Sequence, residues 1–168
     1  MEYGLQLIAA SMLIASGYGD IGPLDWFELD RAALMIGEAC GDGPREEPAG
    51  LDCVASMAAV WEVETGHTFT IYPSARGTGC GVGQVIPTRL GNVRIGWKVT
   101  TPPCDGLRVP RVGFAWAVYM LRLKRQKVGR RRMFGAYNGS PLRDRYQRRA
   151  ERTYRRAVRA CRHMGGGC

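Results

Sequence analysis

The sequence lacks any apolar run of the roughly 18–20 consecutive residues that are needed to cross a bilayer. It also shows no internal repeat at the period of a solenoid. Hydrophobic residues make up 45% of its 168 residues and charged residues 23%, values that are usual for globular proteins and argue against disorder. The length is sufficient for one domain with a hydrophobic core of its own.

The sequence also has little that would bind a metal ion. No Cys-x-x-Cys is present and the two histidines, His67 and His163, lie far apart, so we expect neither a metal site nor a cofactor. Six cysteines, in contrast, are many for a small cytosolic protein. Their even number favours up to three disulfides in an oxidising compartment, with fifteen possible pairings. The cysteines are Cys40, Cys53, Cys80, Cys104, Cys161 and Cys168.

Basic residues are scarce in the first part of the chain. Residues 1–64 contain twelve acidic and two basic side chains, a net charge of −10, so the remainder carries +19. The most apolar segment, Leu5–Ala15, is preceded by Glu2 and by no Lys or Arg, which a secretory signal normally has. We therefore expect a core or docking helix there, with a signal peptide as the alternative.

A second helix is predicted from Leu24 to Ala39, with Asp25 as its N-cap. Gly41 to Gly50 is rich in turn-forming residues and predicts a linker. We thus expect residues 1–50 to form an acidic, helical N-terminal extension and residues 51–168 to form the main domain.

The main domain begins with a helix that is apolar on nearly every side, Leu51–Val63, a pattern typical of a buried helix. Glu64 follows it, and Gly66 suits the position just beyond a helix C-terminus. Apolar surroundings and the negative end of the helix dipole both raise the pKa of a carboxyl group, as a general acid working near neutrality requires. Glu64 is therefore the candidate catalytic acid. Glu62 on the same helix is the alternative by spacing, and a solvent-exposed helix end is the simplest interpretation of Glu64.

Later segments are predicted from their periodicity. Alternation between Val93 and Val99 indicates a short strand or extended loop within Thr88–Pro110. Helices are expected at Arg111–Lys127 and at about Pro141–His163, with a helix end and turn at Phe134–Pro141. The last helix combines one apolar stripe with a strongly cationic outer face. The stripe contains Tyr146, Ala150, Tyr154, Ala157, Val158 and Cys161.

Four short motifs resemble, in order, those of soluble lytic transglycosylases and the wider lysozyme-like superfamily. They are Glu64-Thr65-Gly66, Ser74 with Gly77, Gly81-Val82-Gly83-Gln84 followed by Pro87, and Ala136-Tyr137-Asn138-Gly139, spanning about Leu51 to Pro141. Thr65 replaces the usual Ser of the family, Gly83 stands where a Met normally packs, and residues between Gly77 and Gly81 look inserted.

The resemblance implies a mainly α, lysozyme-like α+β fold with a small strand or loop region beside the cleft. It further implies a peptidoglycan lytic transglycosylase that cleaves the β-1,4 bond between N-acetylmuramic acid and N-acetylglucosamine. Glu64 would be the catalytic residue, Tyr137 would hydrogen-bond or orient it, and Ser74, Gln84 and Asn138 would contact the glycan strand.

The distribution of carboxylates agrees with this chemistry. No Asp or Glu occurs between Glu64 and Asp105, whereas most glycosidases need a second carboxylate across the scissile bond. A transglycosylase uses one acid, and forms a 1,6-anhydro product without water. A lysozyme-type muramidase that uses Asp105 or a cleft-bound water is the alternative chemistry.

Partners and location follow from charge and from the family. The basic last helix could be a solvated face, could attract anionic wall polymers or could hold DNA phosphates. We expect a wall-penetrating enzyme of a phage virion, or a periplasmic enzyme that opens the wall for a secretion apparatus. The rival from another class is a non-enzymatic structural protein that binds DNA or a partner through its basic face.

Overall fold

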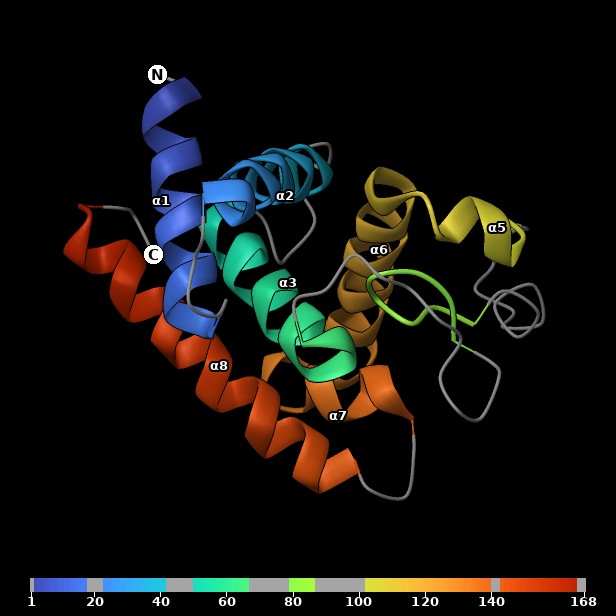
Figure 1. Cartoon of the computed structure of the whole chain (residues 1–168). Helices are drawn as coiled ribbons and strands as arrows, with labels where there is room; N and C mark the ends of the chain where they lie inside the picture. The colour runs from blue at the N-terminus through green and yellow to red at the C-terminus, as the bar shows by residue number, and fades with distance from the viewer. Residues whose placement is uncertain are drawn as a thin grey trace.

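A computed structural model describes residues 2–17, 23–41, 50–66, 79–86, 102–139 and 143–165. Seven α-helices and one 3-10 turn make up this part of the chain (Figure 1). The bounds are α1 Glu2–Ser16, α2 Pro23–Gly41, α3 Gly50–Thr65, α5 Cys104–Leu107, α6 Pro110–Val128, η1 Arg130–Arg132, α7 Met133–Asn138 and α8 Arg143–His163. Within the same ranges, no helix is long and apolar enough to span a membrane.

Helix α3 lies at the centre of the bundle, in contact with α1, α2, α6 and α8 (Figure 1). Every residue from Cys53 to Trp61 is buried, because helices pack against it from several sides. Trp61 meets Phe114 of α6 edge to face, with 5.1 Å between the ring centroids. The prediction of a buried helix here is confirmed. Its end is also confirmed, since Gly66 follows with a left-handed φ of 64° and donates its N–H to Glu62 O.

The two N-terminal helices contribute to the same hydrophobic core as the rest of the chain. Ala9, Met12 and Leu13 of α1 and Leu29 and Ile36 of α2 are buried in it. The expected helices of the N-terminal extension are confirmed, but Asp25 is not the N-cap of α2. The helix begins two residues earlier at Pro23, whose fixed φ suits the first turn, so Asp25 lies inside it.

Helix α8 packs its apolar stripe against α1, α3 and α7. Tyr146, Ala150, Ala157 and Cys161 are buried as the periodicity predicts, and the helix has its expected length. Helix α6 and the helix end of α7 are confirmed as well, and Gly139 closes α7 in a left-handed conformation.

The described residues contain no strand, so of the predicted α+β fold only its mainly α character is confirmed. One isolated bridge joins Cys80 and Val85. The alternating segment around Val93 lies outside the described residues. The short helix α5, Cys104–Leu107, begins directly after Pro102-Pro103 and was not predicted.

Two disulfides link different elements of the structure. Cys40–Cys53 joins the end of α2 to α3, and Cys80–Cys104 joins the loop before Gln84 to α5. Cys161 is disulfide-bonded as well, and none of the described cysteines is free. The predicted use of the cysteines is thus supported, and it is typical of an oxidising compartment.

Candidate active site

Glu64 occupies the last turn of α3, one residue before the helix ends. Its carboxyl group is shielded by the helices that cover α3, and burial raises its pKa from 4.5 to about 7. The opposing influence is a hydrogen bond from Tyr146, which lowers the pKa. Glu64 therefore holds a proton on about half of the molecules at neutrality, as the sequence analysis expected for a general acid.

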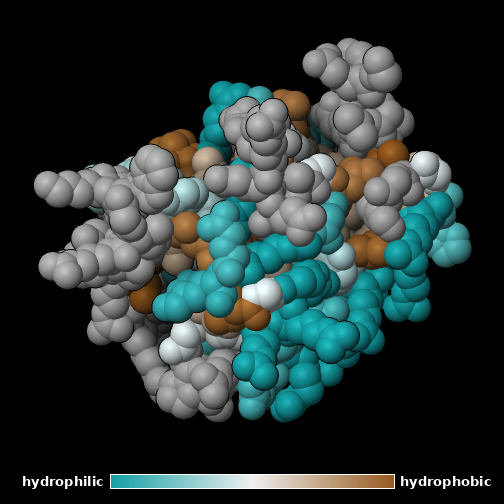
Figure 2. Space-filling view, turned by 180° about the vertical axis from the view of Figure 1, so that it is seen from behind, coloured by the Kyte–Doolittle hydropathy of each residue, from teal (hydrophilic) through white to brown (hydrophobic). Residues whose placement is uncertain are grey.

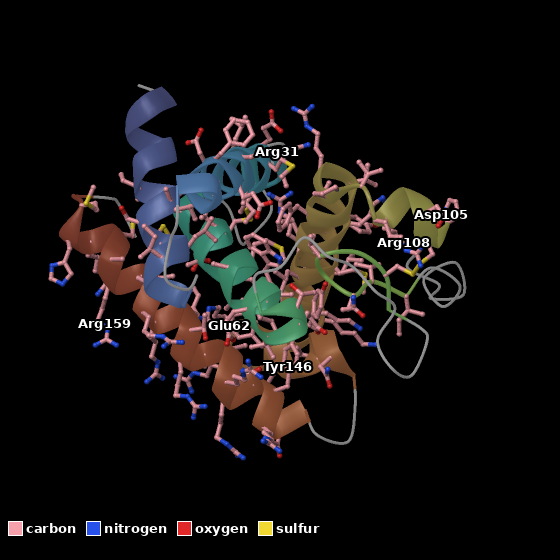
Figure 3. All side chains as sticks on the ribbon, viewed as in Figure 1. Arg31, Glu62, Asp105, Arg108, Tyr146 and Arg159 are labelled. Atoms are coloured by element: carbon pink, nitrogen blue, oxygen red, sulfur yellow. A yellow bond between two sulfur atoms is a disulfide. The ribbon has the colours of Figure 1, made fainter. Side chains whose placement is uncertain are left out.

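Tyr146 of α8 is the residue that hydrogen-bonds to the Glu64 carboxyl group. Its hydroxyl donates to Glu64 Oε1 at 2.8 Å, and the residue is only 8% exposed. Figure 3 shows Tyr146 where α8 passes the end of α3 and α7. Burial and the negative charge of Glu64 raise the pKa of Tyr146 well above its usual value, so it remains a donor. The periodicity of the sequence predicts Tyr146 on the apolar stripe, but it does not indicate this role.

Tyr137 lies close to Glu64 but bonds elsewhere. Its hydroxyl donates to Gly83 O at 2.7 Å, which ties α7 to the loop that contains Gln84. Burial and the charge of Glu64 raise the pKa of Tyr137, so its hydroxyl lies within the field of the carboxylate. The expected direct hydrogen bond from Tyr137 to Glu64 is thus replaced by the one from Tyr146.

The loop 79–86 is a tight, internally bonded turn. Cys80 and Val85 exchange both backbone hydrogen bonds, at 2.9 and 2.8 Å. Gln84 has a positive φ of 48°, the single such case among the described residues other than glycine. Strained backbone of this kind is maintained only where the surroundings impose it, and it clusters at functional sites.

Only one end of the Gln84 side-chain amide is hydrogen-bonded. Its Nε2 donates to Gly81 O at 3.1 Å, while its Oε1 is buried and accepts no hydrogen bond from the described residues. An acceptor left in this state costs roughly 1–3 kcal/mol. Gln84 therefore has an unsatisfied side-chain oxygen and lies in a strained turn. The hydrogen bond from Tyr137 to Gly83 holds this turn near Glu64.

Gly83 allows the loop to pack closely against its neighbours. A Cβ at this position would lie 2.5 Å from Ala117 Cβ and 2.7 Å from the Tyr137 hydroxyl. A larger side chain would not fit at this position, because Ala117 of α6 and Tyr137 already fill the space. The loop thus lies directly against α6 and α7.

Asn138 lines a surface hollow of about 710 Å³ together with Val63 and Tyr146. The remaining lining side chains are arginines of α8. The hollow therefore reaches Tyr146, which donates to Glu64, although Glu64 itself is not among its lining residues. Ser74, the other expected contact with the glycan, lies outside the described residues, as does His67.

Three further carboxylates on α3 and α8 are ion-paired. Glu62, the alternative acid, accepts from Arg149 at 2.9 Å and lines a different hollow. Asp52 pairs with Arg125 at 2.7 Å and Glu151 with Arg130 at 3.1 Å. Asp105 pairs with Arg108 at 3.1 Å, and its side chain is 90% exposed. It lies on α5, well away from Tyr146 in Figure 3, so the geometry does not favour it as a second catalytic carboxylate.

Among the described residues, no group of three or more His, Cys, Asp or Glu could hold a metal ion. Comparison with protein-family models, with curated proteins and with solved structures finds no match to this chain. The interpretation of the site therefore depends on its own geometry and on the motifs of the sequence.

Proposed function

We propose that the protein is a peptidoglycan lytic transglycosylase with Glu64 as its single catalytic acid and base. The observation that carries the proposal is the Glu64 carboxyl group itself. It is partly buried at the end of α3, it accepts from Tyr146 at 2.8 Å, and burial raises its pKa to about 7. Gln84 and Asn138, which the family resemblance assigns to the glycan, and Tyr137, which it assigns to Glu64, lie on the elements around it.

The proposed reaction consists of two proton transfers through one carboxyl group. Glu64 donates its proton to the oxygen of the β-1,4 bond, and the bond from C1 of N-acetylmuramic acid to that oxygen breaks. The Glu64 carboxylate then takes the proton of the C6 hydroxyl of the same sugar, whose oxygen bonds to C1. The products are a new 4-hydroxyl and a 1,6-anhydro end, and Glu64 is protonated again.

One carboxylate is sufficient for this sequence of steps, whereas a muramidase of the usual kind needs two. The described carboxylates other than Glu64 that lie on or beside α3 are held by arginines, which supports the single-acid reaction. A pKa near 7 suits both roles, because the group must give up and regain a proton at the working pH.

The test is digestion of purified peptidoglycan followed by mass spectrometry of the fragments. Anhydro ends are expected, and Glu64→Gln should lower the rate by roughly 10²–10⁴-fold, as loss of a general acid does. Glu62→Gln is the matched control on the same helix and should retain most activity. Reducing ends would replace transglycosylation with hydrolysis by a muramidase. No cleavage by the parent protein would support the non-enzymatic alternative.

The setting that we propose is a phage virion or another extracellular or periplasmic assembly that penetrates the wall locally. The disulfides support an oxidising location. Two helices of the acidic extension, α1 and α2, would present their outer faces to such an assembly. Phe27 and Leu34 of α2 are exposed there, at 72% and 50%.

A further inference from the structure

The outer side of α8 carries a regular row of arginines, which we call the arginine track. It consists of Arg145, Arg148, Arg152, Arg155 and Arg159, all exposed. Steps of three and four residues place them along one side of the helix, opposite the buried stripe. Figure 3 shows Arg159 pointing away from the bundle, and Figure 2 shows a continuous hydrophilic area in its lower right part, where α8 lies in that view.

The arginine track has few counterions of its own. Arg155 pairs with Glu151 at 3.5 Å, and the other four make no ion pair with any carboxylate in the described ranges. Like charges three or four residues apart destabilise a helix. The row therefore reduces the stability of α8, and an anionic ligand would relieve this repulsion.

Two hollows lie along the arginine track, and the first of them reaches Tyr146, which donates to Glu64. One, of about 710 Å³, is lined by Asn138, Val63 and Tyr146 with four arginines of α8. The other, of about 540 Å³, has Glu62 on its wall and extends to Arg159. Arg149 and Arg152 line both, so the hollows adjoin each other. An anion bound in the first hollow would lie against Tyr146, which holds Glu64.

The dimensions indicate a short extended ligand. From Arg145 to Arg159 the helix rises about 21 Å, at 1.5 Å per residue. An extended peptide of about six residues spans a similar length. Guanidinium groups bind carboxylates through paired hydrogen bonds, which gives them specificity for such groups as well as charge. The track has no exposed aromatic side chain on which nucleic-acid bases could stack.

We infer that the arginine track binds the carboxylates of the acidic peptides that substitute a peptidoglycan strand, while the strand itself lies at Glu64. This inference rests on the proposed function and narrows its substrate to peptide-bearing strands. The first hollow receives the part of the peptide nearest the sugar, and the second hollow guides the remainder along α8.

The experiment measures binding of the Glu64→Gln protein to purified insoluble peptidoglycan, with its peptides either present or removed by an amidase. Binding to the peptide-bearing material should be about three- to tenfold tighter, and the difference should shrink as salt rises. The double substitution Arg148→Gln with Arg152→Gln should remove most of this difference. Arg131→Gln with Arg132→Gln, which removes the same charge from exposed positions on η1, should leave it unchanged.

Equal binding to stripped strands, or an equal loss in both double variants, would overturn the inference. Tighter binding to duplex DNA than to peptidoglycan, abolished by the α8 variant, would also overturn it and assign the track to nucleic acid. Failure of the proposed function gives a different pattern. The parent protein would then release no fragments from either material, whatever the binding measurements show.

Discussion

At the scale of single residues, Glu64 makes the pH dependence of the protein predictable. Its pKa of about 7 means that the proton needed to start cleavage is lost as pH rises through neutrality. Initial rates on peptidoglycan should therefore fall above pH 7, to about a tenth of their plateau near pH 8. A rate that stays level to pH 9 would contradict Glu64 as the proton donor.

The same carboxyl group should make the stability of the protein depend on pH in a predictable direction. Its pKa is raised in the folded protein, so the folded state binds the proton more tightly than the unfolded chain between about pH 4.5 and 7. The free energy of unfolding should fall as pH rises through this window, by at most roughly 1.4 kcal/mol per pH unit. Urea titrations of the parent and of Glu64→Gln should diverge in this window, with the variant relatively more stable at pH 7.

Tyr146→Phe tests whether the hydroxyl of Tyr146 positions the acid. The hydrogen bond lowers the pKa of Glu64, so its loss should raise that pKa and shift the alkaline limb of the pH–rate profile upward. The kcat should also fall by about ten- to a hundredfold, because the carboxyl group is no longer oriented. A purely structural role for Tyr146 would lower stability without moving the alkaline limb.

The matched control is Tyr154→Phe on the same helix. Tyr154 donates to Asp52, and it stands two turns further along α8, about 12 Å from Tyr146. This variant should lose some stability and keep the pH–rate profile of the parent.

At the scale of elements, the loop 79–86 depends on the absence of a side chain at Gly83. Gly83→Ala would place a methyl group within 2.7 Å of Ala117 Cβ and the Tyr137 hydroxyl. We expect overpacking to lower the free energy of unfolding by about 1–3 kcal/mol. Activity should also fall markedly, since the variant would strain the hydrogen bond from the Tyr137 hydroxyl to Gly83 O. Chemical denaturation and rate measurements on the same sample check both.

Gly37→Ala in α2 separates this effect from a general response to glycine replacement. A Cβ at Gly37 meets nothing within 4 Å, so alanine should be neutral or should stabilise by about 0.5–1 kcal/mol. Similar behaviour of the two variants would contradict the tight contact at Gly83.

Comparison of the helices with the sequence shows which features could be predicted and which could not. The buried character of α3 could be predicted because apolar residues occur on all its sides, and Glu64 could be selected because it lies at the C-terminal end of that helix and begins the first of the four motifs. The stripe of α8 was equally clear. The partner of Glu64 was not, because a tyrosine on an apolar stripe has the same periodicity whether its hydroxyl meets water or a carboxylate. Residues 64 and 146 are 82 positions apart, so their contact depends on how whole helices pack.

At the scale of the whole molecule, ion pairs join the acidic part of the chain, residues 1–64, to the basic part that follows it. The acidic first part and the basic second part meet in ion pairs between Glu38 and Arg111, Asp52 and Arg125, and Glu62 and Arg149. The hydrophobic core likewise draws on helices from both parts. This arrangement indicates that the N-terminal helices are needed for the stability of the helices that carry Glu64 and Tyr146.

Leu13→Ala tests this dependence on the N-terminal helices. Leu13 of α1 is fully buried in the shared core, and its truncation should cost about 2–5 kcal/mol of the free energy of unfolding. The neighbouring Ile14 is 39% exposed, so Ile14→Ala should cost less than about 1 kcal/mol. Because α1 packs on α8, the first variant should also reduce activity at temperatures where the parent is stable. If both variants unfold like the parent, α1 is an appendage that the catalytic helices do not need, and its role would be confined to docking.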